Sequence, residues 1–199
     1  MVRAFNVFAL VILVGAGTLL PGLALAHTAD GVAGGFMSGL AHPVLGADHI
    51  VAMVAVGLWG AFLGAPAIWV LPIVFPLVMA FGAVLGVLGV PIPAVETGIA
   101  TSAVVLGLLV LMAARLPLWL AAVIVGVFAI FHGYAHGVEL PAAANPFAYG
   151  VGFVIATGCL HLVGIAFGLL ARWPAGVYAV RAGGGVICLV GLAFLFGVA

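Results

Sequence analysis

The sequence predicts an all-α, polytopic membrane protein: one domain of about six transmembrane helices that follows a cleavable signal peptide. Hydrophobic residues make up 68% of the 199 residues, and charged residues only 4%, whereas about 25% of the residues of a soluble domain are charged. Long apolar runs recur along the chain, and each approaches the roughly 20 residues with which a helix crosses a bilayer. A chain this apolar has too little polar surface to face water, so we expect its solvent to be the lipid bilayer.

Residues 1–26 have the pattern of a secretory signal peptide. Arg3 supplies the positive start, an apolar core follows, and Ala24-Leu25-Ala26 fits the small-x-small cleavage rule. An uncleaved anchor helix is the alternative. We therefore expect the mature domain to be residues 27–199. Cleavage after Ala26 would place the new α-amino group beside the imidazole of His27, a chelating pair for a transition metal, although His27 could equally lie in a disordered tail.

Six apolar runs follow, near residues 45–64, 66–90, 95–113, 117–137, 147–171 and 176–198. We expect each to be a helix, because a helix satisfies its own backbone polar groups in lipid. Proline and glycine, which end helices, separate the runs. A shorter run at 31–41 cannot cross alone. It is interpreted as a re-entrant or interfacial helix, or as an extension of the first span.

The arginines predict the direction of the spans. A cleaved signal places the mature N-terminus in the periplasm, and six spans then put Arg115, Arg172 and Arg181 at the cytoplasmic side of a bacterial inner membrane, in agreement with the positive-inside rule. The formal net charge is zero and there is no basic patch, so nucleic acid is not an expected partner.

The ionisable residues gather at the outer side of this predicted topology. Membrane insertion of an Asp at a helix centre costs about 2.5–3.5 kcal/mol, so such groups mark functional candidates. His132, His136 and Glu139 follow i, i+4 and i+7 spacing and share a helix face. Pro43 and Gly46 predict a broken stretch that leads into a helix starting near Gly46. The candidate site residues are His42, Asp48 and His49 in the first span, Glu96 in the third, His132, His136 and Glu139 in the fourth, His161 deeper in the fifth, and His27 in the tail.

Imidazole combined with carboxylate is the ligand set of Ni, Zn, Cu or Fe rather than of Mg or Ca. The H-E-x-x-H motif of zinc proteases and the Gly-rich phosphate loop are both absent from the sequence, and no motif predicts an enzyme. Three interpretations stay open from the residues alone: a metal permease, a membrane-embedded metal- or haem-binding or assembly protein without transport, and a polar network that only ties helices together. The residues around the ligands could include Ser38, Tyr134, Thr97, Thr101 and Ser102, which the sequence does not place.

Two motifs resemble the HupE/UreJ family of nickel permeases, which are associated with hydrogenase and urease maturation. They are HPVLGADHIVAMVAVGLWG at 42–60 and FHGYAHGVE at 131–139, supported by VETGIATSAVVLGLL at 95–109 and ATGCLHLVG around His161. Many members are expected to carry a third histidine where this chain has Tyr134, which leaves the metal preference open.

The resemblance implies that His42, Asp48, His49, His132, His136 and Glu139 handle the metal. It also implies Ni²⁺, or Co²⁺, as the transported substrate with no prosthetic group. The implied partners are the metal ion and the lipid bilayer, with a homo-oligomer and a link to hydrogenase or urease maturation as further expectations.

Overall fold

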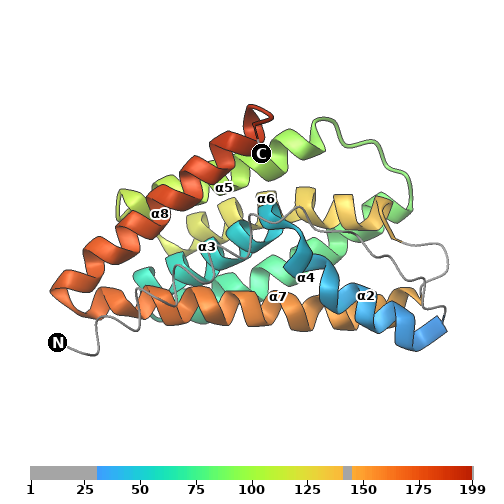
Figure 1. Cartoon of the computed structure of the whole chain (residues 1–199), viewed down its shortest axis with the longest axis horizontal. Coiled ribbons are helices and arrows are strands. Elements are labelled where there is room, and N and C mark those ends of the chain that lie inside the picture. The colour runs from blue at the N-terminus through green and yellow to red at the C-terminus, as the bar shows by residue number, and fades with distance from the viewer. Residues whose placement is uncertain (1–30, 141–144, 199) are drawn as a thin grey trace.

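The computed structural model describes residues 31–140 and 145–198, and every regular element in these ranges is a helix (Figure 1). The predicted signal peptide and His27 lie outside the described residues. The helices are α2 (Gly31–Leu45), α3 (Ala47–Leu63), α4 (Ala67–Val87), α5 (Val95–Leu111), α6 (Leu118–Val138), α7 (Pro146–Gly168), the short 3₁₀ helix η1 (Leu169–Arg172) and α8 (Pro174–Leu195).

Local chemistry explains where these helices begin and end. Proline occupies the first turn of α7 and α8, where its missing N–H costs nothing. The Asn145 side chain also accepts a hydrogen bond from the Ala148 N–H at 2.9 Å and so caps α7. Gly89, with φ of +68°, follows the end of α4 in the left-handed conformation that glycine adopts without strain. Each of the six predicted runs therefore coincides with one helix.

Within the described residues, four helices are long and apolar enough to cross a membrane: α4, α6, α7 together with η1, and α8. The bent pair formed by α2 (from Gly34) and α3 would be a fifth span. Helix α5 is apolar as well, but with 17 residues it is shorter. The chain is thus a multi-pass, all-helical membrane protein.

The break between α2 and α3 is narrower than the sequence suggested. Pro43 lies inside α2, which continues to Leu45, and only Gly46 separates it from α3. The predicted interruption at Pro43 is therefore wrong. A proline removes a single backbone hydrogen bond, and here the ladder resumes at once, since the Gly46 N–H reaches the His42 carbonyl at 3.3 Å. The two helix axes then differ by 79°.

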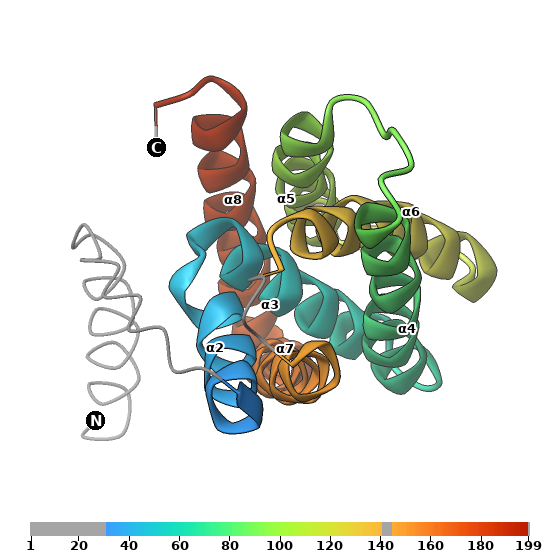
Figure 2. The same cartoon turned by 90° about the vertical axis from the view of Figure 1, so that its right-hand side faces the viewer.

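Helix α7 shows how α2 and α3 are related. Gly39 of α2 packs on the Tyr149 carbonyl near the start of α7, whereas Gly57 of α3 packs on the His161 carbonyl further along it. Figure 1 shows α2 beside one part of α7, and Figure 2, which looks along α7, shows α3 running across it. The segment 31–41 therefore leads directly into the first predicted run, as part of a broken span or of a re-entrant loop.

Glycines set the other close helix pairs. A Cβ at Gly133 or Gly137 of α6 would overlap with the backbone carbonyls of Met79 or Ala83 in α4. A Cβ at Gly107 of α5 would overlap in the same way with the backbone carbonyl of Gly184 in α8. Small residues at such contacts let helices approach closely, which is how helices associate in lipid.

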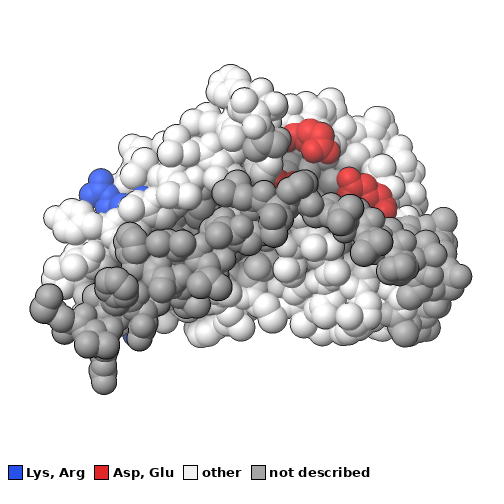
Figure 3. Space-filling view, viewed as in Figure 1, with Lys and Arg blue, Asp and Glu red and all other residues white. Residues whose placement is uncertain are grey.

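Charge is divided between the two ends of the bundle. On the face shown in Figure 3, the basic atoms lie toward one end and the acidic atoms toward the other. Arg115 and Arg172 line one 300 Å³ cavity, and the Arg181 Nε donates to the Leu111 carbonyl at 2.8 Å beside it. This end contains the last residues of α3, α5 and α7.

Candidate functional site

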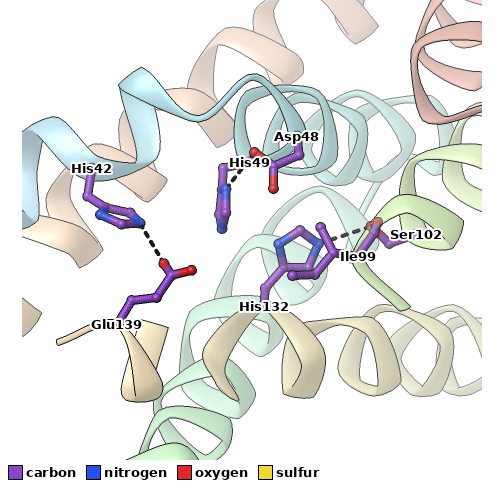
Figure 4. A network of polar contacts seen from close by, with 7 residues as sticks. All are labelled: His42, Asp48, His49, Ile99, Ser102, His132 and Glu139. Atoms are coloured by element: carbon purple, nitrogen blue, oxygen red, sulfur yellow. Dashed lines mark hydrogen bonds and ion pairs between the residues drawn. The ribbon is translucent and has the colours of Figure 1, made fainter. Parts of the chain in front are cut away.

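Three helices bring histidine and carboxylate to one place. His42 lies near the end of α2, Asp48 and His49 occupy the first turn of α3, and His132 and His136 lie in the last turns of α6. Glu139 ends α6. Figure 4 shows His42, Asp48, His49, His132 and Glu139 gathered beside the 79° bend between α2 and α3. We call His42, His49, His132 and His136 the histidine cluster.

The outer part of the site contains the exposed carboxylate. The Nε2 of His42 is 3.6 Å from the Glu139 Oε2, and these side chains are 33% and 52% exposed. His42, His136 and Glu139 each offer one ligand atom, and these three atoms lie within 4.8 Å of one another. Ligand atoms about 2 Å from a shared ion are at most about 4 Å apart. Small side-chain rotations would therefore let this trio hold a divalent cation.

Asp48 determines which nitrogen of His49 faces the cluster. The His49 Nδ1 is 2.9 Å from the Asp48 Oδ1. An ionised carboxylate only accepts hydrogen bonds, so the proton resides on Nδ1 and the lone pair on Nε2. That Nε2 is buried and has no partner among the described residues. The His49 ring centroid is 4.4 Å from that of His136 and 5.2 Å from that of His132.

Ser102 of α5 plays the corresponding role for His132. Its hydroxyl donates to the Ile99 carbonyl at 2.6 Å and lies 3.0 Å from the His132 Nε2. Since a hydroxyl has one proton to donate, the His132 Nε2–H must be the donor in the second bond. The lone pair of His132 is then on Nδ1, which is buried and also without a partner in the described part of the chain.

The cluster thus presents several ligand atoms that no other described group satisfies. Both ring nitrogens of His136 belong to this set, together with the His49 Nε2 and the His132 Nδ1. A buried polar atom left without a partner costs about 1–3 kcal/mol. Neutral imidazoles held in fixed tautomers by a carboxylate and a hydroxyl are how proteins orient metal ligands. The arrangement is suited to bind a borderline transition-metal ion.

His42 and His136 are too close to hold a haem between them. A haem would lie between two axial imidazoles, but the His42 and His136 ring centroids are only 4.8 Å apart. His136 also contacts Phe153 at a centroid distance of 4.2 Å. Rings in direct contact leave no slot for a macrocycle between them.

The remaining predicted residues have different positions. His161 is buried in α7. The ring centroid of Phe75 in α4 lies 5.6 Å from those of both His161 and His132. Glu96 is exposed in the first turn of α5 and is not part of the trio around Glu139. His27 lies outside the described residues.

Sequence reasoning missed the aromatic walls of the site. Tyr149 and Phe153 of α7 and Phe75 of α4 are buried against the histidines. The available signal was the spacing on α7, where Tyr149, Phe153 and His161 share one helix face.

Comparison with known proteins agrees with the motifs. The family described as "HupE / UreJ protein" matches residues 13–194. The chain is also 46% identical over 185 residues to "Protein HupE" of Rhizobium leguminosarum bv. viciae, a match that covers 92% of this chain and 95% of that relative. No solved structure matches the chain. The extent of the family match and this identity show that the chain belongs to the HupE/UreJ family.

Proposed function

We propose that this protein is a bacterial inner-membrane permease that takes up Ni²⁺, or Co²⁺, from the periplasm. The observation that carries the proposal is the histidine cluster, in which imidazoles from three helices converge beside Glu139 and those of His49, His132 and His136 keep unpartnered nitrogens. The resemblance of motifs 42–60 and 131–139 to nickel permeases supports the choice of metal. The ion would be substrate rather than resident cofactor.

The proposed topology has six spans. The bent α2–α3 pair and the four long helices supply five, and the apolar α5 would be the sixth. The mature N-terminus is then periplasmic, following removal of residues 1–26. The arginine-rich end would face the cytoplasm. His27 would help to capture the ion, and the exposed Glu96 would attract cations to the periplasmic side.

The ion would first meet His42, His136 and Glu139, and then move to His49 and His132. Asp48 would act by orienting His49. The membrane potential suffices as a driving force, because a divalent cation that crosses 100 mV gains about 4.6 kcal/mol. Binding must be weak enough for the ion to leave, so the incomplete, partly exposed outer trio fits a transport site better than a closed structural one.

The test is Ni²⁺ entry into liposomes that contain the purified protein, with an inside-negative potential and with Co²⁺ and Zn²⁺ as competitors. We expect saturable entry, and we expect His136→Ala to lower it about 10–100-fold or more, since loss of a partner of a metal ligand already costs that much. Tyr178→Phe is the control, because Tyr178 is 74% exposed at the other end of the bundle.

Metal binding in detergent without flux by correctly inserted protein would contradict transport and favour a binding or assembly protein. Unchanged flux in folded His136→Ala protein would contradict the assigned site.

A further inference from the structure

A stripe of four residues on α7 leads from the histidine cluster into the bundle. Tyr149, Phe153, Thr157 and His161 recur at intervals of four, so they share one helix face, and all four are buried. Tyr149 and Phe153 contact the cluster, with ring centroids 6.1 Å from His42 and 4.2 Å from His136. At 1.5 Å rise per residue, His161 lies roughly 12 Å further along the helix than Phe153.

The inner end of this stripe carries polar atoms that the outer site does not use. The Thr157 hydroxyl oxygen and the His161 Nε2 are both buried, and neither has a hydrogen-bond partner among the residues described. Thr157 is 0% and His161 2% exposed. Two uncompensated polar atoms on one helix face are costly in an apolar bundle, and they are suited to receive a cation.

Prolines interrupt the backbone ladder of α4 close to His161. Because Pro76 has no N–H, the carbonyl of Pro72, four residues earlier, has no partner within the helix. The His161 Nε2 is also without a partner among the described residues.

Phe75 contacts one histidine from each of the two groups of ligands. Its side chain is 0% exposed, and its ring centroid lies 5.6 Å from both His132 and His161. Phe75 has no lone pair to offer a cation. An ion that moves from His132 to His161 would therefore pass beside an apolar ring, and apolar constrictions can close pores to ions.

The helix that carries Phe75 is weakened next to it. Pro72 and Pro76 flank Phe75 inside α4, and each proline removes one backbone hydrogen bond. Transmembrane helices bend at such positions because neighbouring groups satisfy the freed carbonyls. A small bend between the two prolines would move the Phe75 ring.

We propose that Phe75 is the gate between the histidine cluster and an inner divalent-cation site formed by Thr157 and His161. This inference rests on the proposed permease function and adds a second binding site to it. The ion then moves between two buried sites, and the bend of α4 at its two prolines opens the way.

The experiment measures Ni²⁺ flux into liposomes and Ni²⁺ affinity in detergent for each variant. Phe75→Ala should raise flux about tenfold, the effect of removing one modest barrier, and should also admit Mg²⁺. Phe75→Leu should raise the flux less, and it replaces Phe75→Ala in the test if that variant does not fold. His161→Ala should lower flux about tenfold or more while leaving the Ni²⁺ affinity of the outer site unchanged. Phe81→Leu is the matched control, because Phe81 is on the same helix and 56% exposed.

The gate would be overturned if folded Phe75 variants carry Ni²⁺ at the wild-type rate and still exclude Mg²⁺. A lower Ni²⁺ flux in these variants would overturn it as well. The inner site would be overturned if His161→Ala leaves the Ni²⁺ flux unchanged. No flux from the wild-type protein would overturn the permease itself and the gate with it, so the two failures are distinguishable.

Discussion

Ser102 determines how His132 takes part in the site. Its hydroxyl is already committed to the Ile99 carbonyl, so it accepts the His132 Nε2–H and leaves Nδ1 for a metal. Ser102→Ala removes the acceptor, and the ring is then free to place its proton on Nδ1. We expect Ni²⁺ affinity in detergent, measured by calorimetry, to fall about 10–100-fold, while Ser102→Thr, which keeps the hydroxyl, stays near wild type.

A purely structural role for Ser102 would give a different result. Both variants would then change thermal stability, and neither would selectively weaken metal binding. Wild-type affinity in folded Ser102→Ala protein would show that the Ser102 hydrogen bond does not set the tautomer of His132.

Particular residues show how far sequence reasoning reached at this scale. The cost of ionisable groups in lipid and the i, i+4 spacing identified His132, His136 and Glu139, and the structure brings these beside His42 and His49. The aromatic partners could not be found, because Phe75 resembles any other apolar residue of a membrane helix until its neighbours are known. Glu96 carried the right chemistry, but only the fold shows that its side chain is exposed.

At the scale of the helices, glycine contacts position the cluster. His132 and His136 flank Gly133, and α6 carries them against α4 through this glycine. In Gly133→Ala, the new methyl group would overlap with the Met79 carbonyl, so the helices must separate. We expect a loss of about 1–3 kcal/mol of stability and weaker Ni²⁺ binding, measured by thermal unfolding in detergent and by calorimetry.

Gly126→Ala is the matched control on the same helix. A Cβ there would meet only Val78 and Val74 side-chain atoms at 3.8 and 4.0 Å, and alanine is about 1 kcal/mol better than glycine inside a helix. This variant should be as stable as wild type or more so. Equal behaviour of the two variants would contradict the role of the α4–α6 contact.

The helix ends were predictable because proline and glycine mark them, whereas the path of the first span was not. The sequence suggested that Pro43 interrupts the helix, but the helix is broken only at Gly46. Pro43 is tolerated because it removes a single backbone hydrogen bond near the end of α2. The 79° bend depends on how α2 and α3 each pack on α7. Such contacts join residues more than 100 positions apart, and apolar periodicity carries no information about them.

At the scale of the whole molecule, the separation of charge makes the orientation testable. Arg115 and Arg172 lie at the end where α3, α5 and α7 finish, while His42 and Glu139 lie toward the other. Positive residues are retained on the cytoplasmic side during insertion. The histidine cluster should therefore open to the periplasm, as uptake requires.

Cysteine labelling in intact cells tests this orientation directly. With Cys159 and Cys188 replaced by alanine, Val90→Cys would mark the α4–α5 connection and Met112→Cys the end of α5; the native side chains are 41% and 70% exposed. A membrane-impermeant maleimide added outside should react with the first and not with the second, and inside-out vesicles should reverse the pattern. Labelling of Met112→Cys from outside would place the arginines in the periplasm. The histidine cluster would then face the cytoplasm, and the same ligands would serve export rather than uptake.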